Sequence, residues 1–118
     1  MATYTKLKLS GSTNGRGIKV AATATAGTTI HTAQSGTTDG LYDEIYLWCI
    51  NTSTTAVKLT IEWGGVTAPD DHIEVTIPGE MGLYSVVPGF VLQNSLVVRA
   101  FAGTANVLII HGHVHRIS

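Results

Sequence analysis

The abundance of β-branched residues restricts the possible folds of this chain more than any other feature. Its 118 residues include 17 Thr, 11 Val and 10 Ile. These side chains are stiff at χ1, which disfavours a helix and suits a pleated sheet. The sequence therefore predicts an all-β protein.

Short apolar or alternating segments recur along the chain, and turns rich in Gly, Pro, Asn and Asp separate them. The expected strands are 4–9, 18–23, 28–33, 42–51, 56–63, 73–77, 82–87, 90–92, 96–102 and 107–115. Turn signals about every 8–12 residues are typical of sandwiches and barrels. We expect a two-sheet antiparallel β-sandwich of jelly-roll type with about eight to ten short strands.

A glycine-rich stretch separates the first predicted strand from the others. It runs from Gly11 to Gly17 and contains little that could be buried. Such a stretch favours a hinge or a long turn. We expect residues 1–17 to form an N-terminal strand or arm with a hinge, and residues 18–118 to form the sandwich domain.

The charge content excludes several classes of function. Only 13% of the residues are charged, the formal net charge is −1 and the pI is near 6.5. No basic face is available for a run of phosphates, so nucleic-acid binding is not expected. The apolar runs are strand-sized rather than membrane-sized, and the first residues lack the apolar core of a signal peptide. We expect no membrane partner, and synthesis and assembly in a cytosol.

Several strands carry consecutive apolar residues, which predicts that both of their faces are covered. Val97-Val98 and Leu108-Ile109-Ile110 are examples. A single sandwich of this length covers only one face of each sheet. Because few charges keep copies apart, we expect a homo-oligomer.

The sharpest local pattern is His111-Gly112-His113-Val114-His115. Alternate side chains of a strand share one face, where two imidazoles can chelate one ion. His111, His113 and His115 are therefore candidate metal ligands. The alternative is a C-terminal strand with one polar face whose histidines are solvated or hydrogen-bonded. No carboxylate ligand lies nearby in sequence, so we assign no metal firmly and expect no cofactor.

Other candidate chemistry is weaker. Asp70-Asp71-His72 with Glu74 is compatible with a calcium or acid–base site, although Pro69 favours a turn. Cys49 lies in an apolar run without an adjacent base, which is typical of a buried thiol. The aromatic residues fall mostly within apolar strands, so core packing is favoured over a carbohydrate platform.

The chain from Gly17 to Ile117 resembles small virion proteins of tailed bacteriophages, particularly capsid decoration (cement) proteins. The resemblance rests on the Thr/Ala-rich segment 17–31, on Leu59-Thr60-Ile61-Glu62-Trp63-Gly64-Gly65 and on Leu96-Val97-Val98-Arg99-Ala100-Phe101-Ala102. It implies a trimeric β-rich protein that binds the major capsid protein at symmetry axes and clamps the shell against packaged DNA. The implied location is the virion surface, with no catalytic residue.

The expected function is therefore a non-enzymatic structural one. The isolated first strand suggests an arm that contacts the shell, and its candidate partner-binding residues are Tyr4, Lys6, Leu7, Leu9 and Arg16. An alternative function is a carbohydrate- or receptor-binding module of a phage tail or fibre, which needs an exposed Trp63 or Tyr84. A third is a small metal-dependent jelly-roll enzyme that uses the three C-terminal histidines.

Overall fold

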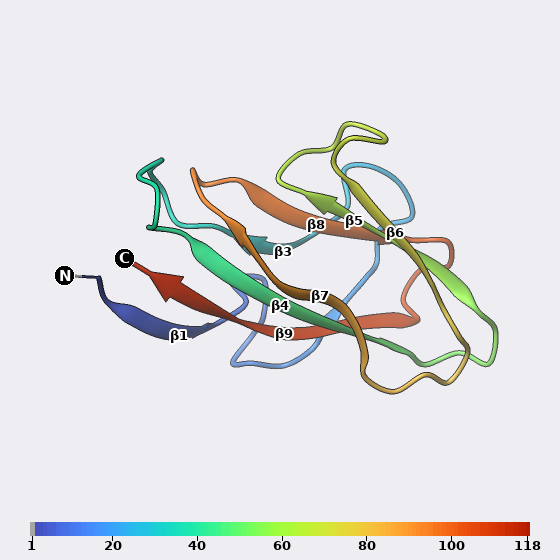
Figure 1. Cartoon of the computed structure of the whole chain (residues 1–118). Coiled ribbons are helices and arrows are strands. Elements are labelled where there is room, and N and C mark those ends of the chain that lie inside the picture. Colours follow the sequence, from blue (N-terminus) through green and yellow to red (C-terminus); the bar gives the residue numbers. More distant parts are fainter. Residues whose placement is uncertain (1) are drawn as a thin grey trace.

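The computed structural model describes residues 2–118 and confirms the all-β prediction (Figure 1). No helix in these residues has the length and apolarity needed to cross a membrane. The strands are β1 (Tyr4–Lys8), β2 (Ile18–Lys19), β3 (Thr28–Thr32), β4 (Asp43–Asn51), β5 (Val57–Trp63), β6 (His72–Ile77), β7 (Tyr84–Leu92), β8 (Val97–Ala102) and β9 (Leu108–Ile117).

The strands form two antiparallel sheets that pack as a sandwich. The five-stranded sheet has the order β1-β9-β4-β7, and β2 pairs with β9 beyond β1. The four-stranded sheet has the order β3-β8-β5-β6. Strands from the two ends of the chain pair with each other, and the pairing continues inward as β1·β9, β3·β8, β4·β7 and β5·β6. This nested order of pairs is the jelly-roll arrangement.

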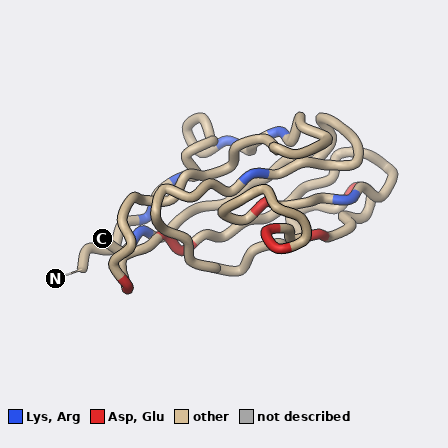
Figure 2. Tube along the Cα trace, turned by 90° about the horizontal axis from the view of Figure 1, so that it is seen from above, with Lys and Arg blue, Asp and Glu red and all other residues tan. Residues whose placement is uncertain are grey.

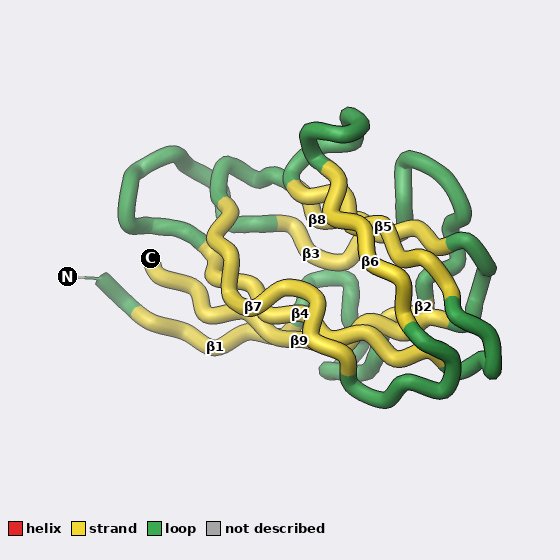
Figure 3. Tube along the Cα trace, turned by 45° about the vertical axis from the view of Figure 1, so that its right-hand side comes forward, coloured by secondary structure: helices red, strands yellow, loops and turns green. Residues whose placement is uncertain are grey.

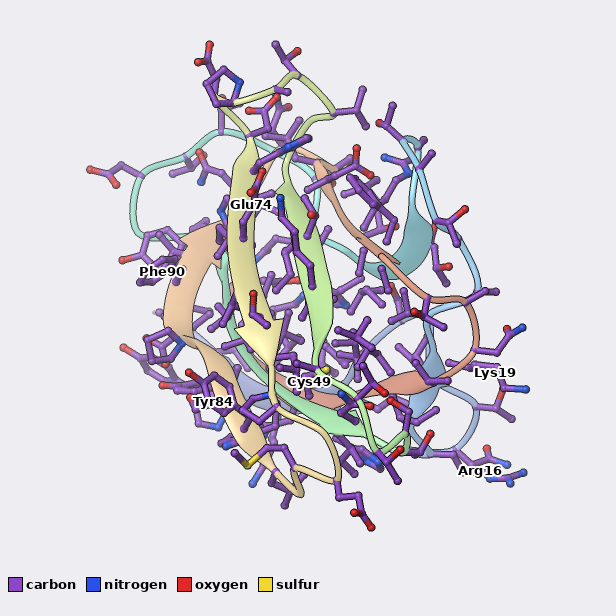
Figure 4. All side chains as sticks on the ribbon, turned by 90° about the vertical axis from the view of Figure 1, so that its right-hand side faces the viewer. Arg16, Lys19, Cys49, Glu74, Tyr84 and Phe90 are labelled. Atoms are coloured by element: carbon purple, nitrogen blue, oxygen red, sulfur yellow. The ribbon has the colours of Figure 1, made fainter. Side chains whose placement is uncertain are left out.

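The core lies between the two sheets and follows from the period of two along each strand. In β4, Ile45, Leu47 and Cys49 are fully buried, whereas the residues between them are half-buried on the outer face. Figure 4 shows Cys49 between the sheets. The buried thiol matches its expected role, and burial raises its pKa to about 12.

Three predicted segments differ most from the strands of the structure. The segment expected at 18–23 is a strand only at Ile18 and Lys19. After Val20, whose N–H still donates to the carbonyl of Leu108 in β9, the chain crosses to the other sheet. There Ala22 accepts a hydrogen bond from the backbone N–H of Ala102 in β8. The segments expected at 82–87 and 90–92 form one strand, β7, through Pro88. An edge strand tolerates Pro88, and shifts of register absorb the irregularity.

The N-terminal segment is part of the sandwich in this structure (Figure 3). β1 and β2 form an interrupted edge along β9, and the glycine-rich residues 11–17 loop out between them. Leu9 is buried in the common core, and the N–H of Gly11 donates to the carbonyl of Ile30 at 2.9 Å. The expected arm is thus an edge strand whose end is anchored to β3.

Candidate functional site

The outer face of the five-stranded sheet gathers histidine and aromatic side chains from β4 and β9. The register places Tyr46 opposite His113 and Trp48 opposite His111, with His115 one step further along β9. All five side chains are half-buried. We call these five residues the histidine–aromatic face.

The rings of this face stack on one another. Tyr46 and His113 have ring centroids 4.9 Å apart and planes 16° apart. Trp48 stacks on the same imidazole at 5.7 Å and 25°, and His115 lies 5.2 Å from His113. His113 is therefore the centre of a ladder of rings across the two strands.

Stacking determines what the face can recognise. Rings that cover one another's faces present mainly their edges to solvent, whereas a carbohydrate platform needs uncovered faces. The stacking of His113 between Tyr46 and Trp48 thus leaves a row of ring edges. Such a surface is suited to contact with another protein, where aromatic side chains are enriched.

The electrostatics of the face are set by one carboxylate and one lysine. The Tyr46 hydroxyl donates to Oε1 of Glu44 at 2.5 Å, and this hydrogen bond raises the pKa of Tyr46. Nδ1 of His115 lies 3.6 Å from the same oxygen. Burial, assisted by the charge of Lys6, lowers the pKa of His113. The neutral form of the central imidazole is therefore favoured.

The structure places His111, His113 and His115 on one face, as the alternation predicts. In the described chain, no group of three or more His, Cys, Asp or Glu side chains is arranged to hold a metal ion. The ring of His113 stacks on Tyr46, and the ring of His115 meets Tyr46 at a tilt of 58°.

Two shallow hollows flank the ladder. One has a volume of about 380 Å³ and is lined by Tyr4, Lys6, Glu44, His115 and neighbouring residues. The other has a volume of about 470 Å³, and its lining consists of Gly15, Trp48, Ile50, Leu83, His111, Gly112 and His113. Leu83 is 66% exposed, so the second hollow has an apolar rim.

The candidate arm residues divide between surface and core. Tyr4, Lys6 and Arg16 are exposed and available to a partner. Leu9 is buried and Leu7 packs partly against the core. The two leucines therefore anchor the segment to its own sandwich.

The acidic candidate segment does not converge on one centre. Asp71 accepts the N–H of Thr67, and Glu74 pairs with Nζ of Lys58 at 2.6 Å. His72 lies between two carboxylates, with Nε2 3.9 Å from Oε2 of Glu62 and Nδ1 3.9 Å from Oε1 of Glu74. These contacts hold the loop and two strands together.

Glu62 is a buried carboxylate that sequence analysis did not single out. It lies on the outer side of the four-stranded sheet, beneath the loop that contains Thr25 and Gly27. The Thr25 hydroxyl and the Gly27 N–H both donate to it, the latter at 2.6 Å. Its strand alternation gives no sign of burial, because a loop distant in sequence covers it.

A second buried polar cluster was also missed. Asp43 is fully buried and accepts two hydrogen bonds from Arg116, at 2.8 and 2.9 Å. Nε2 of His31 lies 2.7 Å from the same carboxylate, and Gln34 lies 3.3 Å away. The inward position of Asp43 in the alternation of β4 was the signal that could have revealed it.

The tautomer of His31 follows from its neighbours. Its Nδ1 accepts the backbone N–H of Ser10 at 3.0 Å, so the proton is on Nε2, which donates to Asp43. Burial lowers the pKa of His31. The cluster joins β4 and β9 to β3 and to the segment that follows β1, which makes its role structural.

Comparisons of the chain with protein-family models, curated proteins and solved structures found no match. The fold and the histidine–aromatic face are therefore the basis for the function proposed below.

Proposed function

We propose that this chain is a non-enzymatic structural protein of a virus particle, a decoration protein of a tailed-bacteriophage capsid. It binds the major capsid protein on the outer shell at symmetry axes, as an oligomer. By clamping neighbouring shell subunits it stabilises the shell against the pressure of packaged DNA. Its location is the virion surface.

The histidine–aromatic face is the observation that carries this proposal. Its side chains are neither fully solvated nor fully buried, and the acidic side chain of Glu44 contacts Tyr46 and His115. A contiguous, weakly charged patch on a sheet is typical of a surface that another protein covers. The scarcity of charge extends over the whole trace in Figure 2.

The rigidity of the sandwich supports the same function. The face is formed by two long strands in the middle of a sheet, and its rings hold one another in place. A surface that is ordered before binding loses little conformational entropy when it docks. When an oligomer binds one shell through several identical weak contacts, its overall affinity exceeds that of each contact alone.

Co-sedimentation with expanded, undecorated shells tests the proposal. The shells are those assembled from the major capsid protein of the phage that encodes this chain. We expect the chain to pellet with them at a fixed stoichiometry and to raise their melting temperature. Absence of binding, or binding without stabilisation, would reject the proposal.

A matched pair of variants tests the face itself. Trp48→Ala removes a ring from the ladder, and we expect it to weaken shell binding at least about tenfold, because aromatic residues dominate interface energies. Phe101→Ala removes a half-buried ring from the outer side of the other sheet and should leave shell binding unchanged. Equal effects of the two substitutions would contradict the assignment of the face.

A second candidate function is the binding of a carbohydrate or receptor, and the hollow beside Trp48 favours it. The aromatic residues that this function was expected to need are less available. Trp63 packs edge-on against Phe90 at 6.1 Å, and Tyr84 is half-buried against the core. This second function would be favoured if the chain bound a glycan but no shell, and if Trp48→Ala abolished the glycan binding.

A further inference from the structure

Each sheet ends in two edge strands, and the fold itself closes two of these four edges. β3 is covered by the segment after β1, since Gly11 donates to Ile30 and Ser10 accepts the N–H of Thr32. β7 is broken by two shifts of register and contains Pro88, which has no N–H. These devices block strand addition. The regular edges that remain are those of β1 and β6.

The backbone of β1 offers pairing groups at its free edge. Thr3 and Ser118 exchange both of their hydrogen bonds, so the antiparallel alternation directs the backbone groups of Thr5 and Leu7 toward β9. The N–H and C=O groups of Tyr4, Lys6 and Lys8 therefore point away from β9. The side chains of these three residues are exposed.

The backbone of β6 has a matching alternation. Trp63 donates to the carbonyl of Asp71, so Ile73 and Val75 are the residues whose backbone groups bond to β5. The backbone groups of Glu74 and Thr76 point outward, and both side chains are exposed. In both strands the residues with free backbone groups thus have exposed side chains, apart from the half-buried His72; Thr5 is also exposed, but its backbone groups are directed toward β9.

The two edges carry opposite charge. The first acidic residue of the chain is Asp39, whereas Lys6, Lys8, Arg16 and Lys19 all precede it. β6 presents Glu74, whose carboxylate also pairs with Lys58 of β5 at 2.6 Å, and β6 follows directly after Asp70 and Asp71. Figure 4 shows Arg16 and Lys19 on one side of the molecule, away from Glu74. Lysines on an edge discourage an uncharged or basic strand, but they favour an acidic one.

The two edges lie on opposite sides of the sandwich. β1 is on the side of β3, as the bond from Gly11 to Ile30 shows. β6 is on the side of β7, because its neighbour β5 contacts β7 through Trp63 and Phe90 and β6 lies beyond β5 in the sheet. The β1 and β6 edges of one copy therefore cannot pair with each other, so β1 must pair with β6 of a second copy. Each copy in such a pair still has one open edge, which can bind another copy.

We propose that copies of this chain associate head to tail, with β1 of one copy pairing antiparallel with β6 of the next. Lys6 lies opposite the neighbour's Glu74, and Tyr4 lies opposite the neighbour's Thr76. In this register both lysines of β1 are on the face that carries Glu74. The contact is heterologous, so it closes into a ring when the rotation between copies permits. This interface belongs to the chain alone and does not depend on shell binding.

Light scattering on the purified full chain during size-exclusion chromatography tests the interface. We expect the mass of two or more chains, each of 12.4 kDa. Lys6→Glu should raise the dissociation constant about tenfold, because it places like charges opposite each other. Glu74→Lys should do the same, and the double variant that carries both substitutions should assemble again. Lys19→Glu, a charge reversal on β2, is the matched control and should assemble normally.

A disulfide test fixes the register. Tyr4→Cys combined with Thr76→Cys leaves Lys6 and Glu74 intact and brings two thiols opposite each other across the interface. Oxidation should give covalent oligomers on a non-reducing gel. Thr5→Cys with Thr76→Cys should give none, because Thr5 directs its side chain to the other face. Cys49 is buried and does not compete.

A wild-type chain that is monomeric at high micromolar concentration would overturn the proposal. So would a dissociation constant that Lys6→Glu leaves unchanged, or a double variant that fails to reassemble although its melting curve is unchanged. Failure of shell binding would leave all of these results unaffected, so the two proposals are tested separately.

Discussion

Asp43 shows how one buried residue connects distant parts of the chain. Its carboxylate is reached by Arg116 from β9 and by His31 from β3, and Ser10 holds the other side of that imidazole. A charge without water is tolerated only when it is paired and hydrogen-bonded. The cluster therefore fixes the relative positions of the two sheets at one end of the sandwich.

We expect Asp43→Ala to lower the free energy of unfolding by about 3–5 kcal/mol, because it leaves the partners of a buried ion pair without a carboxylate. Urea unfolding followed by tryptophan fluorescence measures this change. Asp39→Ala, in an exposed loop, is the control and should stay within about 0.5 kcal/mol of wild type. A loss below about 1 kcal/mol for Asp43→Ala would show that the cluster contributes little.

Stability should fall as the pH is lowered from about 6.5, the pKa of an unperturbed histidine. Burial lowers the pKa of His31, so the unfolded chain takes up a proton before the folded chain does. At lower pH Asp43 adds to the loss: burial opposes the change, but hydrogen bonds from Arg116 and His31 lower its pKa. Denaturant midpoints between pH 7 and pH 5 report the slope.

The pKa of His113 is lowered as well, and its contribution has the same sign. His31→Gln and His113→Gln, measured separately and together, divide the slope between the two histidines. A slope unchanged in His31→Gln would contradict the assignment of a neutral, buried ring at this position.

For β9, the existence of the strand could be predicted from the sequence, but its partners in the sheet could not. Its alternation of apolar residues with histidines is visible in the sequence, and the structure confirms a strand there. The sequence does not show that β9 is a central strand, or that its histidines face Tyr46 and Trp48, because pairing between distant strands is not encoded locally. Burial of Glu62 under the loop at Thr25 was missed for the same reason.

Gly112 is required by the close approach of β9 to β4. A Cβ atom at this position would overlap the carbonyl oxygen of Tyr46. We expect Gly112→Ala to cost about 1–3 kcal/mol, since the β4 backbone or the Leu47 side chain must shift. Gly82→Ala meets open space and is the matched control. Thermal unfolding of both variants measures the difference, and equal melting temperatures would contradict the close approach.

The whole molecule is a jelly roll with a polarised surface. One outer face bears the histidine–aromatic ladder, one edge carries the N-terminal lysines and the opposite side presents β6. The composition predicted the fold class and the low charge. It could not predict which two edges stay open, because the closure of β3 depends on Ser10 and Gly11 and that of β7 on its shifts of register.

These surfaces assign different tasks to different parts of the molecule. Edge pairing builds the oligomer and leaves the histidine–aromatic face uncovered. Because Lys6 and Glu74 both lie on outer faces, successive copies turn this face to opposite sides of the assembly, and the copies on one side dock. A shell bound through this face would place the four-stranded sheet outermost.

Electron cryomicroscopy of expanded shells incubated with the chain tests the proposed function most directly. We expect added density at symmetry axes, with the outer face of the β1-β9-β4-β7 sheet against the shell. Shells without added density, or density in which the β3-β8-β5-β6 sheet contacts the shell instead, would contradict the proposed function.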